Sequence, residues 1–122
     1  MALATALFAS LILVGVFAGG DPPVACNMKA FSAEQRPRYN DLVKRLRIAL
    51  QSRHELPNGY TYKLDTKGIT LPEVAEWITL ERLCCPFLTF QLDVKGSGET
   101  QLSMTGPTGT KVVLDEEFPK SR

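Results

Sequence analysis

The sequence has few of the residues on which common enzymes and nucleic-acid-binding proteins depend. It contains one histidine and one tryptophan in 122 residues, and its formal net charge is +1. Its basic residues form no long run, which argues against a nucleic-acid footprint, because such a footprint needs a concentrated basic face. No convincing nucleophile–base pair or carboxylate pair is present, so hydrolase chemistry is disfavoured. We therefore expect no nucleic-acid partner.

A nucleotide-binding loop is also missing. The segment 105–111, TGPTGTK, resembles a phosphate-binding loop, but that motif requires GxxxxGK followed by Ser or Thr, and the spacing here is wrong. A glycine-proline turn explains the segment better. Kinase chemistry is therefore disfavoured, and whether the protein is an enzyme of another kind stays open.

Cysteine is scarce, and the chain has no CxxC motif. The three cysteines are Cys26, Cys84 and Cys85, an odd number that predicts one disulfide and one spare thiol in an oxidising compartment. Cys26 can pair with Cys84 or with Cys85, and that closure would stabilise the fold by about 4 kcal/mol through the lower entropy of the unfolded chain. A disulfide between the adjacent Cys84 and Cys85 would require a strained peptide, so we do not expect it.

The same cysteines suggest a second role, the binding of a soft metal or metalloid ion. Thiolates select thiophilic ions, and three thiols suit a trigonal site if Cys26 lies near Cys84 and Cys85. Glu81 precedes the pair by one helical turn and is a candidate extra ligand or proton acceptor. The alternative for Glu81 is an ion pair with Arg82 or another basic residue. The candidate metal ligands are thus Cys84, Cys85, Cys26 and Glu81.

The N-terminal 18 residues carry no charged side chain and are apolar almost throughout. Their length predicts a signal peptide, with cleavage after Ala18. The alternative is an uncleaved anchor in the inner membrane formed by residues 3–18, because the run is close to the length that spans a bilayer. We expect an exported, periplasmic or secreted protein, which contacts a membrane only through this segment, and only if the segment is not cleaved. Residues 19–25 form a spacer.

The clearest helix signals lie before the cysteine pair. Thr70 and Glu73 form a capping box, and apolar residues then recur at helical spacing. Pro86 disfavours helical geometry at Cys85, so the helix is predicted to end at Cys84.

The remaining pattern predicts a single α+β domain over residues 26–118, followed by a tail at 119–122. A first helix opens with a capping box at Ser32 and ends near His54. Strands are predicted at 60–64, 88–94 and 101–105, and a short helix at 112–118. The fold class is then a small antiparallel sheet of about three strands, with two main helices and a short C-terminal helix packed mainly on one face.

The segment Glu81–Phe87, ERLCCPF, resembles a group of small bacterial proteins that carry the motif W-[IV]-x-L-E-x-x-C-C-P-F. The pattern TGPxGxK at 105–111 is similar to their C-terminal segment, and the likeness covers roughly residues 26–118. No activity is established for the group, so the resemblance implies no catalytic residue and no cofactor. It implies that the two segments belong to one domain.

Three hypotheses follow for the function. The first is an exported, small globular protein that binds a soft metal or metalloid through its thiols. The second is a non-catalytic structural or interaction domain whose cysteines form a disulfide staple. The third, a thiol oxidoreductase, is less favoured, because the low thiol pKa that such catalysis uses normally comes from a helix N-terminus or a CxxC motif.

Overall fold

The computed structural model describes residues 22–120 of the chain. Its elements follow in the order η1 (Met28–Ala30), α1 (Gln35–Ala49), β1 (Leu50–Leu56), β2 (Gly59–Leu64), α2 (Leu71–Cys84), β3 (Thr89–Val94), β4 (Thr100–Thr105) and α3 (Thr110–Glu117). The predicted α+β class is confirmed, with four antiparallel strands in place of about three.

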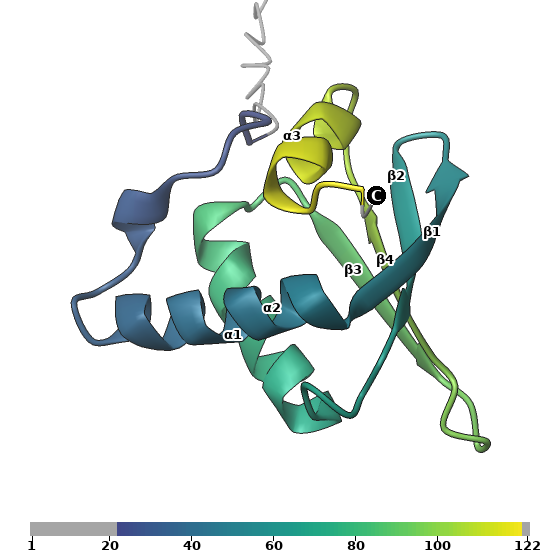
Figure 1. Ribbon diagram of the computed structural model, residues 1–122. Helices are drawn as coiled ribbons and strands as arrows, with labels where there is room; N and C mark the ends of the chain where they lie inside the picture. The colour runs from purple at the N-terminus through teal and green to yellow at the C-terminus, as the bar shows by residue number, and fades with distance from the viewer. Residues whose placement is uncertain (1–21, 121–122) are drawn as a thin grey trace, which may run out of the picture.

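The sheet consists of two hairpins joined side by side. Its strand order is β1-β2-β4-β3, and Tyr62 of β2 lies opposite Leu102 of β4 at the join. Figure 1 shows the three α-helices on one face of this sheet. The large hydrophobic residues of the two central strands that are buried beneath the helices are Tyr60, Tyr62, Leu64, Leu102 and Met104. On the other face, the hydroxyl oxygens of Thr61 and Ser103 lie 2.8 Å apart in a hydrogen bond.

Helix α2 has the ends that the sequence predicts. The Thr70 hydroxyl accepts a hydrogen bond from the Glu73 N–H, and the Glu73 carboxylate accepts one from the Thr70 N–H. Together they satisfy two donors that the first turn of a helix leaves unpaired. The helix ends at Cys84, and Cys85 before Pro86 has a non-helical backbone.

The core of the domain is built around Trp77 of α2, which is fully buried. Its ring meets Phe90 of β3 and Phe118 after α3 edge-on, with ring centroids 5.7 and 5.8 Å away. Edge-to-face pairs at such distances are favourable beyond the area they bury. This contact joins α2, the sheet and the C-terminal segment into one hydrophobic core.

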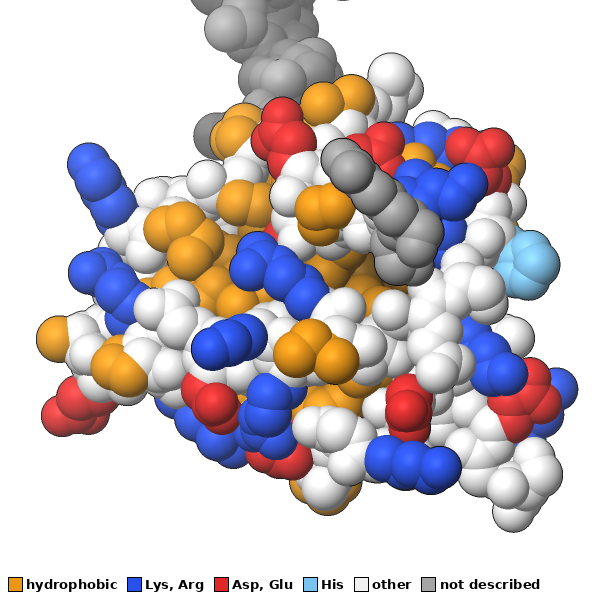
Figure 2. Space-filling model, viewed as in Figure 1, with side chains coloured by type: hydrophobic (Ala, Val, Ile, Leu, Met, Phe, Trp, Pro, Cys, Tyr) orange, Lys and Arg blue, Asp and Glu red, His pale blue; other side chains and the backbone are white. Residues whose placement is uncertain are grey.

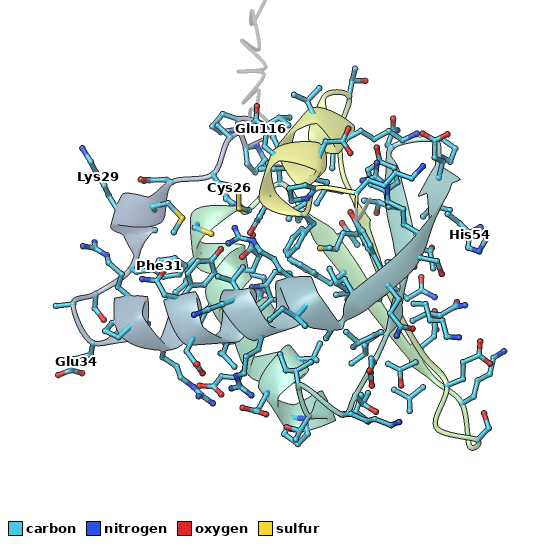
Figure 3. The ribbon with its side chains drawn as sticks, viewed as in Figure 1. Cys26, Lys29, Phe31, Glu34, His54 and Glu116 are labelled. Atoms are coloured by element: carbon cyan, nitrogen blue, oxygen red, sulfur yellow. A yellow bond between two sulfur atoms is a disulfide. The ribbon has the colours of Figure 1, made fainter. Side chains whose placement is uncertain are left out.

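The first helix is shorter than the sequence predicts. It does not reach His54, because α1 ends at Ala49 and Leu50 takes the extended conformation (φ −71°, ψ 118°) that begins β1. This strand lies at the edge of the sheet and most of its residues face solvent, so it lacks the apolar alternation of a half-buried strand. The Pro57–Asn58 turn pairs it with β2. His54 projects from β1 into solvent (Figure 3).

The outer face of α1 carries basic side chains among acidic ones. Arg38 forms a bidentate ion pair with Glu76 of α2, with nitrogen–oxygen distances of 2.8 and 2.6 Å. Arg45 pairs with Asp41 and with Glu73. Figure 2 shows blue and red side chains interspersed in this region of the surface. Exposed pairs of this kind contribute little to stability, so the face is mainly a solvated one.

An N-terminal arm connects the spacer to α1. The Asn27 N–H donates to the Cys84 carbonyl oxygen (2.7 Å), which ties the arm to the end of α2. The Phe31 ring packs on Tyr39 of α1, with centroids 4.4 Å apart. The predicted capping box at Ser32–Gln35 is formed in both directions. The segment between the spacer and α1 is therefore an arm with one short 3-10 turn.

The signal peptide or anchor predicted at residues 1–18 lies outside the described residues. Across residues 22–120, none of the helices combines the length and the apolar character needed to traverse a bilayer. The predicted C-terminal helix at 112–118 is present as α3, which begins two residues earlier at Thr110 and ends at Glu117.

We predict that Gly59→Ala destabilises the domain by roughly 2 kcal/mol or more, because a Cβ there would lie 1.9 Å from the Met104 carbonyl oxygen across the β2–β4 join. Gly96→Ala is the matched control, since a Cβ at Gly96 meets nothing within 4 Å. Chemical denaturation of the three proteins measures the difference. Equal stability of Gly59→Ala and the wild type would contradict the close approach of these strands.

Candidate functional site

The three cysteine sulfur atoms meet at the C-terminal end of α2. Cys26 and Cys85 form a disulfide that spans 59 positions of sequence, with their Cα atoms 4.5 Å apart. Cys84 is a free and fully buried thiol, and its Sγ lies 3.3 Å from the Sγ of Cys85. The structure thus selects Cys85 from the two partners that the sequence left open for Cys26.

Local geometry explains this choice. Cys84 is the last residue of α2 and belongs to the buried stripe of the helix, so its side chain points into the core. Cys85 leaves the helix with a different backbone direction, and the arm that carries Cys26 is held against the helix end by the hydrogen bond from Asn27. Figure 3 shows Cys26 between the arm and the neighbouring ends of α2 and α3.

An acidic pair lies beside the sulfur atoms, formed by the buried Glu81 and the half-buried Glu117. Glu81 is fully buried, one turn before Cys84, and its Oε2 lies 2.8 Å from the Tyr39 hydroxyl oxygen. The Oε1 atom of Glu117 lies 3.0 Å from the same hydroxyl. The hydroxyl has one proton and can donate to one carboxylate, so the second contact requires a protonated carboxyl group that donates to the hydroxyl oxygen. The geometry therefore indicates that one of the two acids is neutral.

The environment favours the neutral forms of these groups. Burial raises the pKa of Glu81 well above its usual range, and the negative charge of Glu117 raises it further. Burial, followed by the charge of Glu81, raises the pKa of the Tyr39 hydroxyl. Burial also raises the pKa of the Cys84 thiol to about 12, with Glu81 as the next cause. Reactive cysteines have a lowered thiol pKa, so the site disfavours Cys84 as the nucleophile of a thiol oxidoreductase.

Sulfur and carboxylate atoms converge closely enough to surround an ion. One side-chain ligand atom from each of Cys26, Glu81, Cys85 and Glu117 lies within 4.8 Å of the other three. The Oε1 atom of Glu81 and the Oε2 atom of Glu117 are buried without a hydrogen-bond partner among the described residues. Such orphaned oxygens are unfavourable in a protein interior. A proton, a water molecule or a cation bound here would satisfy them.

The group has a route to solvent on the side of Cys26. A pocket of about 300 Å³ is lined by residues that include Cys26, Tyr39 and Glu117. Glu81 and Cys85 are fully buried behind these residues. A small ion or reductant would therefore reach the sulfur atoms past Cys26.

The structure brings together most of the residues predicted from sequence. Cys26, Cys85 and Glu81 fall within one group, and Cys84 contacts it through Cys85. Within residues 22–120 the predicted alternative, an ion pair between Glu81 and a basic residue, is not formed: the partner of Glu81 there is the Tyr39 hydroxyl.

Sequence reasoning missed Glu117 and the polar role of Tyr39. Tyr39 lies on the buried face of α1, at helical spacing from Leu42, Val43 and Leu46. Glu117 follows the buried Leu114 by three residues and so lies on the same side of α3. That spacing was the available signal for Glu117, but it could not show that the C-terminal helix lies beside the end of α2.

We predict that wild-type stability falls as the pH rises above 4.5, the ordinary pKa of the Glu81 carboxyl group, into the alkaline range. The folded state holds the Glu81 proton more tightly than the unfolded chain does, so this stabilisation is complete at low pH and is lost as the pH approaches the raised pKa. Glu81→Gln should flatten the dependence and be more stable at alkaline pH by about 2 kcal/mol.

Thermal unfolding across this pH range tests the prediction, with Glu116→Gln as a control at an exposed acid of α3. The control should keep the slope of the wild type. A Glu81→Gln protein with the same slope as the wild type would show that Glu81 is ionised in the folded state.

No family model, curated protein or solved structure matches this chain. The likeness of the cysteine segment to the group of small bacterial proteins thus stays a prediction. The function has to be argued from the site itself.

Proposed function

We propose that the protein, once its disulfide is reduced, binds a thiophilic metal or metalloid ion through Cys26, Cys84 and Cys85. The observation that carries this proposal is the convergence of the three sulfur atoms beside an acidic pair, of which Glu81 is buried and Glu117 half-buried. The disulfide is then the oxidised, ion-free form of the site. Two equivalents of a small thiol reductant would convert it to the binding form: the first forms a mixed disulfide with one cysteine, and the second displaces that cysteine, which leaves two protein thiols and the oxidised reductant.

The arrangement of the sulfur atoms favours three-coordinate binding. Adjacent cysteines chelate one small tetrahedral ion poorly, but Cys26 approaches from a separate segment of the chain. Reduction of one bond supplies two thiols that already face each other, and the Cys84 thiol lies in contact with one of them. Soft ions that prefer sulfur ligands fit this donor set better than Mg²⁺ or Ca²⁺, which prefer oxygen.

The acidic pair has a supporting role in this proposal. Thiols lose their protons when they bind such an ion. Glu81 can accept one of these protons or act as an extra ligand, since its Oε1 atom has no hydrogen-bond partner among the described residues. Glu117, which shares the Tyr39 hydroxyl with Glu81, lies in the same group of potential ligands.

Arsenite is a direct probe of a three-thiol site, because trivalent arsenic forms three As–S bonds and loses three water molecules. We expect the reduced protein to bind one arsenic atom, which native mass spectrometry would detect with no free thiol left for alkylation. The protein with its disulfide intact should bind none. Cys84→Ser and Cys85→Ser should each weaken binding at least about tenfold, since each removes one ligand.

Leu83→Ser is the matched control, because Leu83 is exposed in the same helical turn and contributes no ligand. It should bind arsenite as the wild type does. The proposal is overturned if the double variant Cys84→Ser/Cys85→Ser keeps wild-type affinity for the ion, or if the reduced wild type binds none.

A second candidate function is a structural or interaction domain in which the disulfide acts as a staple. The bond itself favours this candidate, because it fixes the arm to the end of α2 and closes a loop across 59 positions of sequence. Restricting the unfolded chain in this way lowers its conformational entropy, which stabilises the folded state by about 4 kcal/mol. A small domain gains proportionately more from such a bond than a large one does.

The staple predicts a loss of stability by about 2–4 kcal/mol, or several degrees in Tm, in a Cys26→Ala variant. Met28→Ala changes an exposed residue of the same arm and should unfold as the wild type does. Differential scanning calorimetry of both variants under oxidising conditions measures the effect. An unchanged Tm for Cys26→Ala would exclude a structural role for the bond.

We also infer export of the protein, on the basis of the predicted signal peptide or anchor at residues 1–18. The disulfide supports this inference, because such bonds form and persist in oxidising compartments.

A further inference from the structure

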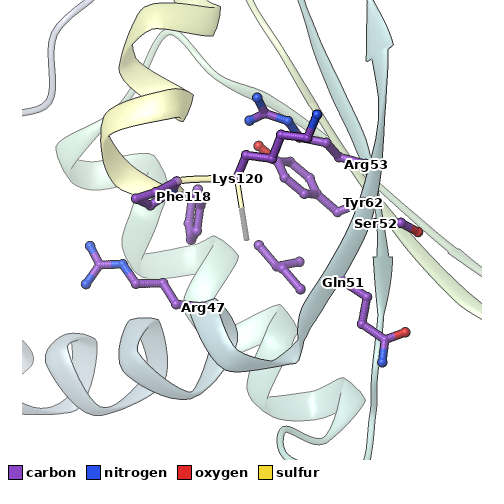
Figure 4. Close-up of a pocket in the computed structure, with 9 residues that line it drawn as sticks. Arg47, Gln51, Ser52, Arg53, Tyr62, Phe118 and Lys120 are labelled. Carbon is purple, nitrogen blue, oxygen red and sulfur yellow. The ribbon is translucent and has the colours of Figure 1, made fainter. Parts of the chain in front are cut away.

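A second pocket lies away from the cysteine site, and its chemistry is different. It has a volume of about 250 Å³ and lies where α1 passes into β1, against the segment that follows α3. Figure 4 shows the side chains around it. Leu50 and Phe118 are among its apolar lining residues, and Arg47, Arg53 and Lys120 are its charged ones. No acidic residue is part of the lining among the residues that the structure describes.

We propose that this pocket binds a small organic carboxylate, with the apolar body of the ligand against Leu50 and Phe118 and its anionic group near the three cations. The proposal is independent of ion binding at the cysteines. It rests on three observations: a buried hydroxyl group without a partner, a group of cations with unused donors, and an irregularity of the sheet at the same place.

The unpartnered group is the hydroxyl of Tyr62. This residue lines the pocket and is 2% exposed, yet its hydroxyl oxygen has no hydrogen-bond partner among the described residues. Leaving such a group unsatisfied in the interior costs roughly 1–3 kcal/mol. Burial raises the pKa of Tyr62 to about 12 against the opposing effect of the nearby Arg53 guanidinium, so the hydroxyl keeps its proton at neutral pH. It is thus a ready donor to a carboxylate oxygen.

The three cations retain donors for an anion. Each guanidinium group has five N–H donors. Among residues 22–120, Arg47 uses its Nε to donate to the Glu117 carbonyl oxygen (2.8 Å), and Arg53 uses Nη1 to donate to Asp115 (2.8 Å). Asp115 therefore offsets one of the three positive charges at the pocket. In the view of Figure 4, Lys120 extends toward the side on which Arg53 and the Tyr62 hydroxyl lie.

The sheet is irregular beside this pocket. The pairing of β1 with β2 shifts register between Leu50 and Arg53, so Gln51 and Ser52 face the single residue Lys63. Both bulged residues line the pocket, and their side chains point away from its centre in Figure 4. Bulges occur often beside binding sites, where they redirect side chains and interrupt the pairing of the strands. This one places Arg53 and Tyr62 opposite each other at the pocket.

The volume limits the size of the ligand. At about 30 Å³ for each water molecule, the pocket has room for roughly eight of them. A lipid or a folded peptide is too large, whereas a single ring or a short aliphatic chain with one carboxylate fits. The balance of three cations against one paired carboxylate favours a ligand with one negative charge over a neutral one.

Titration of the full-length ¹⁵N-labelled protein with phenylacetate tests the proposal, with phenylacetamide as the neutral analogue of the same shape. We expect saturable shifts of amide resonances confined to the pocket, including those of Leu50 and Phe118. Phenylacetamide should bind at least about tenfold more weakly, because it is neutral and cannot form charge-assisted hydrogen bonds with the cations of the pocket.

Variants of the pocket distinguish specific recognition of the carboxylate from non-specific binding. Tyr62→Phe removes only the unpartnered hydroxyl, so it should fold normally and weaken phenylacetate binding about tenfold while leaving the amide unaffected. Lys120→Gln should weaken phenylacetate as well. Lys63→Gln, next to Tyr62 but on the opposite face of β2, should bind as the wild type does.

The proposal is overturned by the absence of saturable shifts at the pocket into the millimolar range, by equal affinities for phenylacetate and phenylacetamide, or by unchanged binding in a folded Tyr62→Phe protein. Shifts that spread over the basic residues of the whole surface would also overturn it, because they would indicate non-specific attraction of the anion.

Discussion

The burial of Trp77 against the sheet positions the end of α2 and, with it, the cysteine site. The Trp77 ring lies between Phe90 of β3 and Phe118 after α3, so its contacts hold three elements at once. A helix held at its middle against two partners has little freedom to rotate or slide. Its last turn therefore presents Glu81 and Cys84 to the interior, and the residue that follows is directed toward the arm.

The buried acid at this site is unfavourable for so small a domain. Glu81 is buried with one oxygen unpaired among the described residues, and its hydrogen-bond partner is a tyrosine hydroxyl and not a basic side chain. A staple alone would need neither this acid nor a third cysteine in contact with the disulfide. Departures from local rules in a protein interior tend to mark functional sites, since apolar groups in the same volume would be more favourable. This contrast favours ion binding over a purely structural disulfide as the role that we propose for the site.

The fold could be predicted largely from sequence because its main elements carry strong local signals. The Thr70–Glu73 capping box and Pro86 defined both ends of α2, and the alternation in β3 and β4 showed a hairpin. Strand β1 was not predicted, because an exposed edge strand has no alternating pattern and its sequence continues the polar face of α1.

Only part of the candidate site could be predicted from the sequence. The adjacent Cys84 and Cys85 and the spacing of Glu81 stand out within one helix. The part supplied by Glu117 could not be seen, because it depends on how α3 packs against α2 at long range. The pocket at Tyr62 could not be predicted for a similar reason. A register shift in β1 and the segment after α3 create this pocket, and neither changes the local periodicity of hydrophobic residues.

The arrangement of the sheet as two joined hairpins has a consequence for how the chain folds. The ladders β1–β2 and β3–β4 each connect neighbouring segments and close short loops, so they can form early at small entropic cost. The β2–β4 ladder connects residues on either side of α2, and its closure has to wait until that helix crosses the sheet. We therefore expect the docking of these two halves to govern the rate of folding, with the contacts between β2 and β4 closing last.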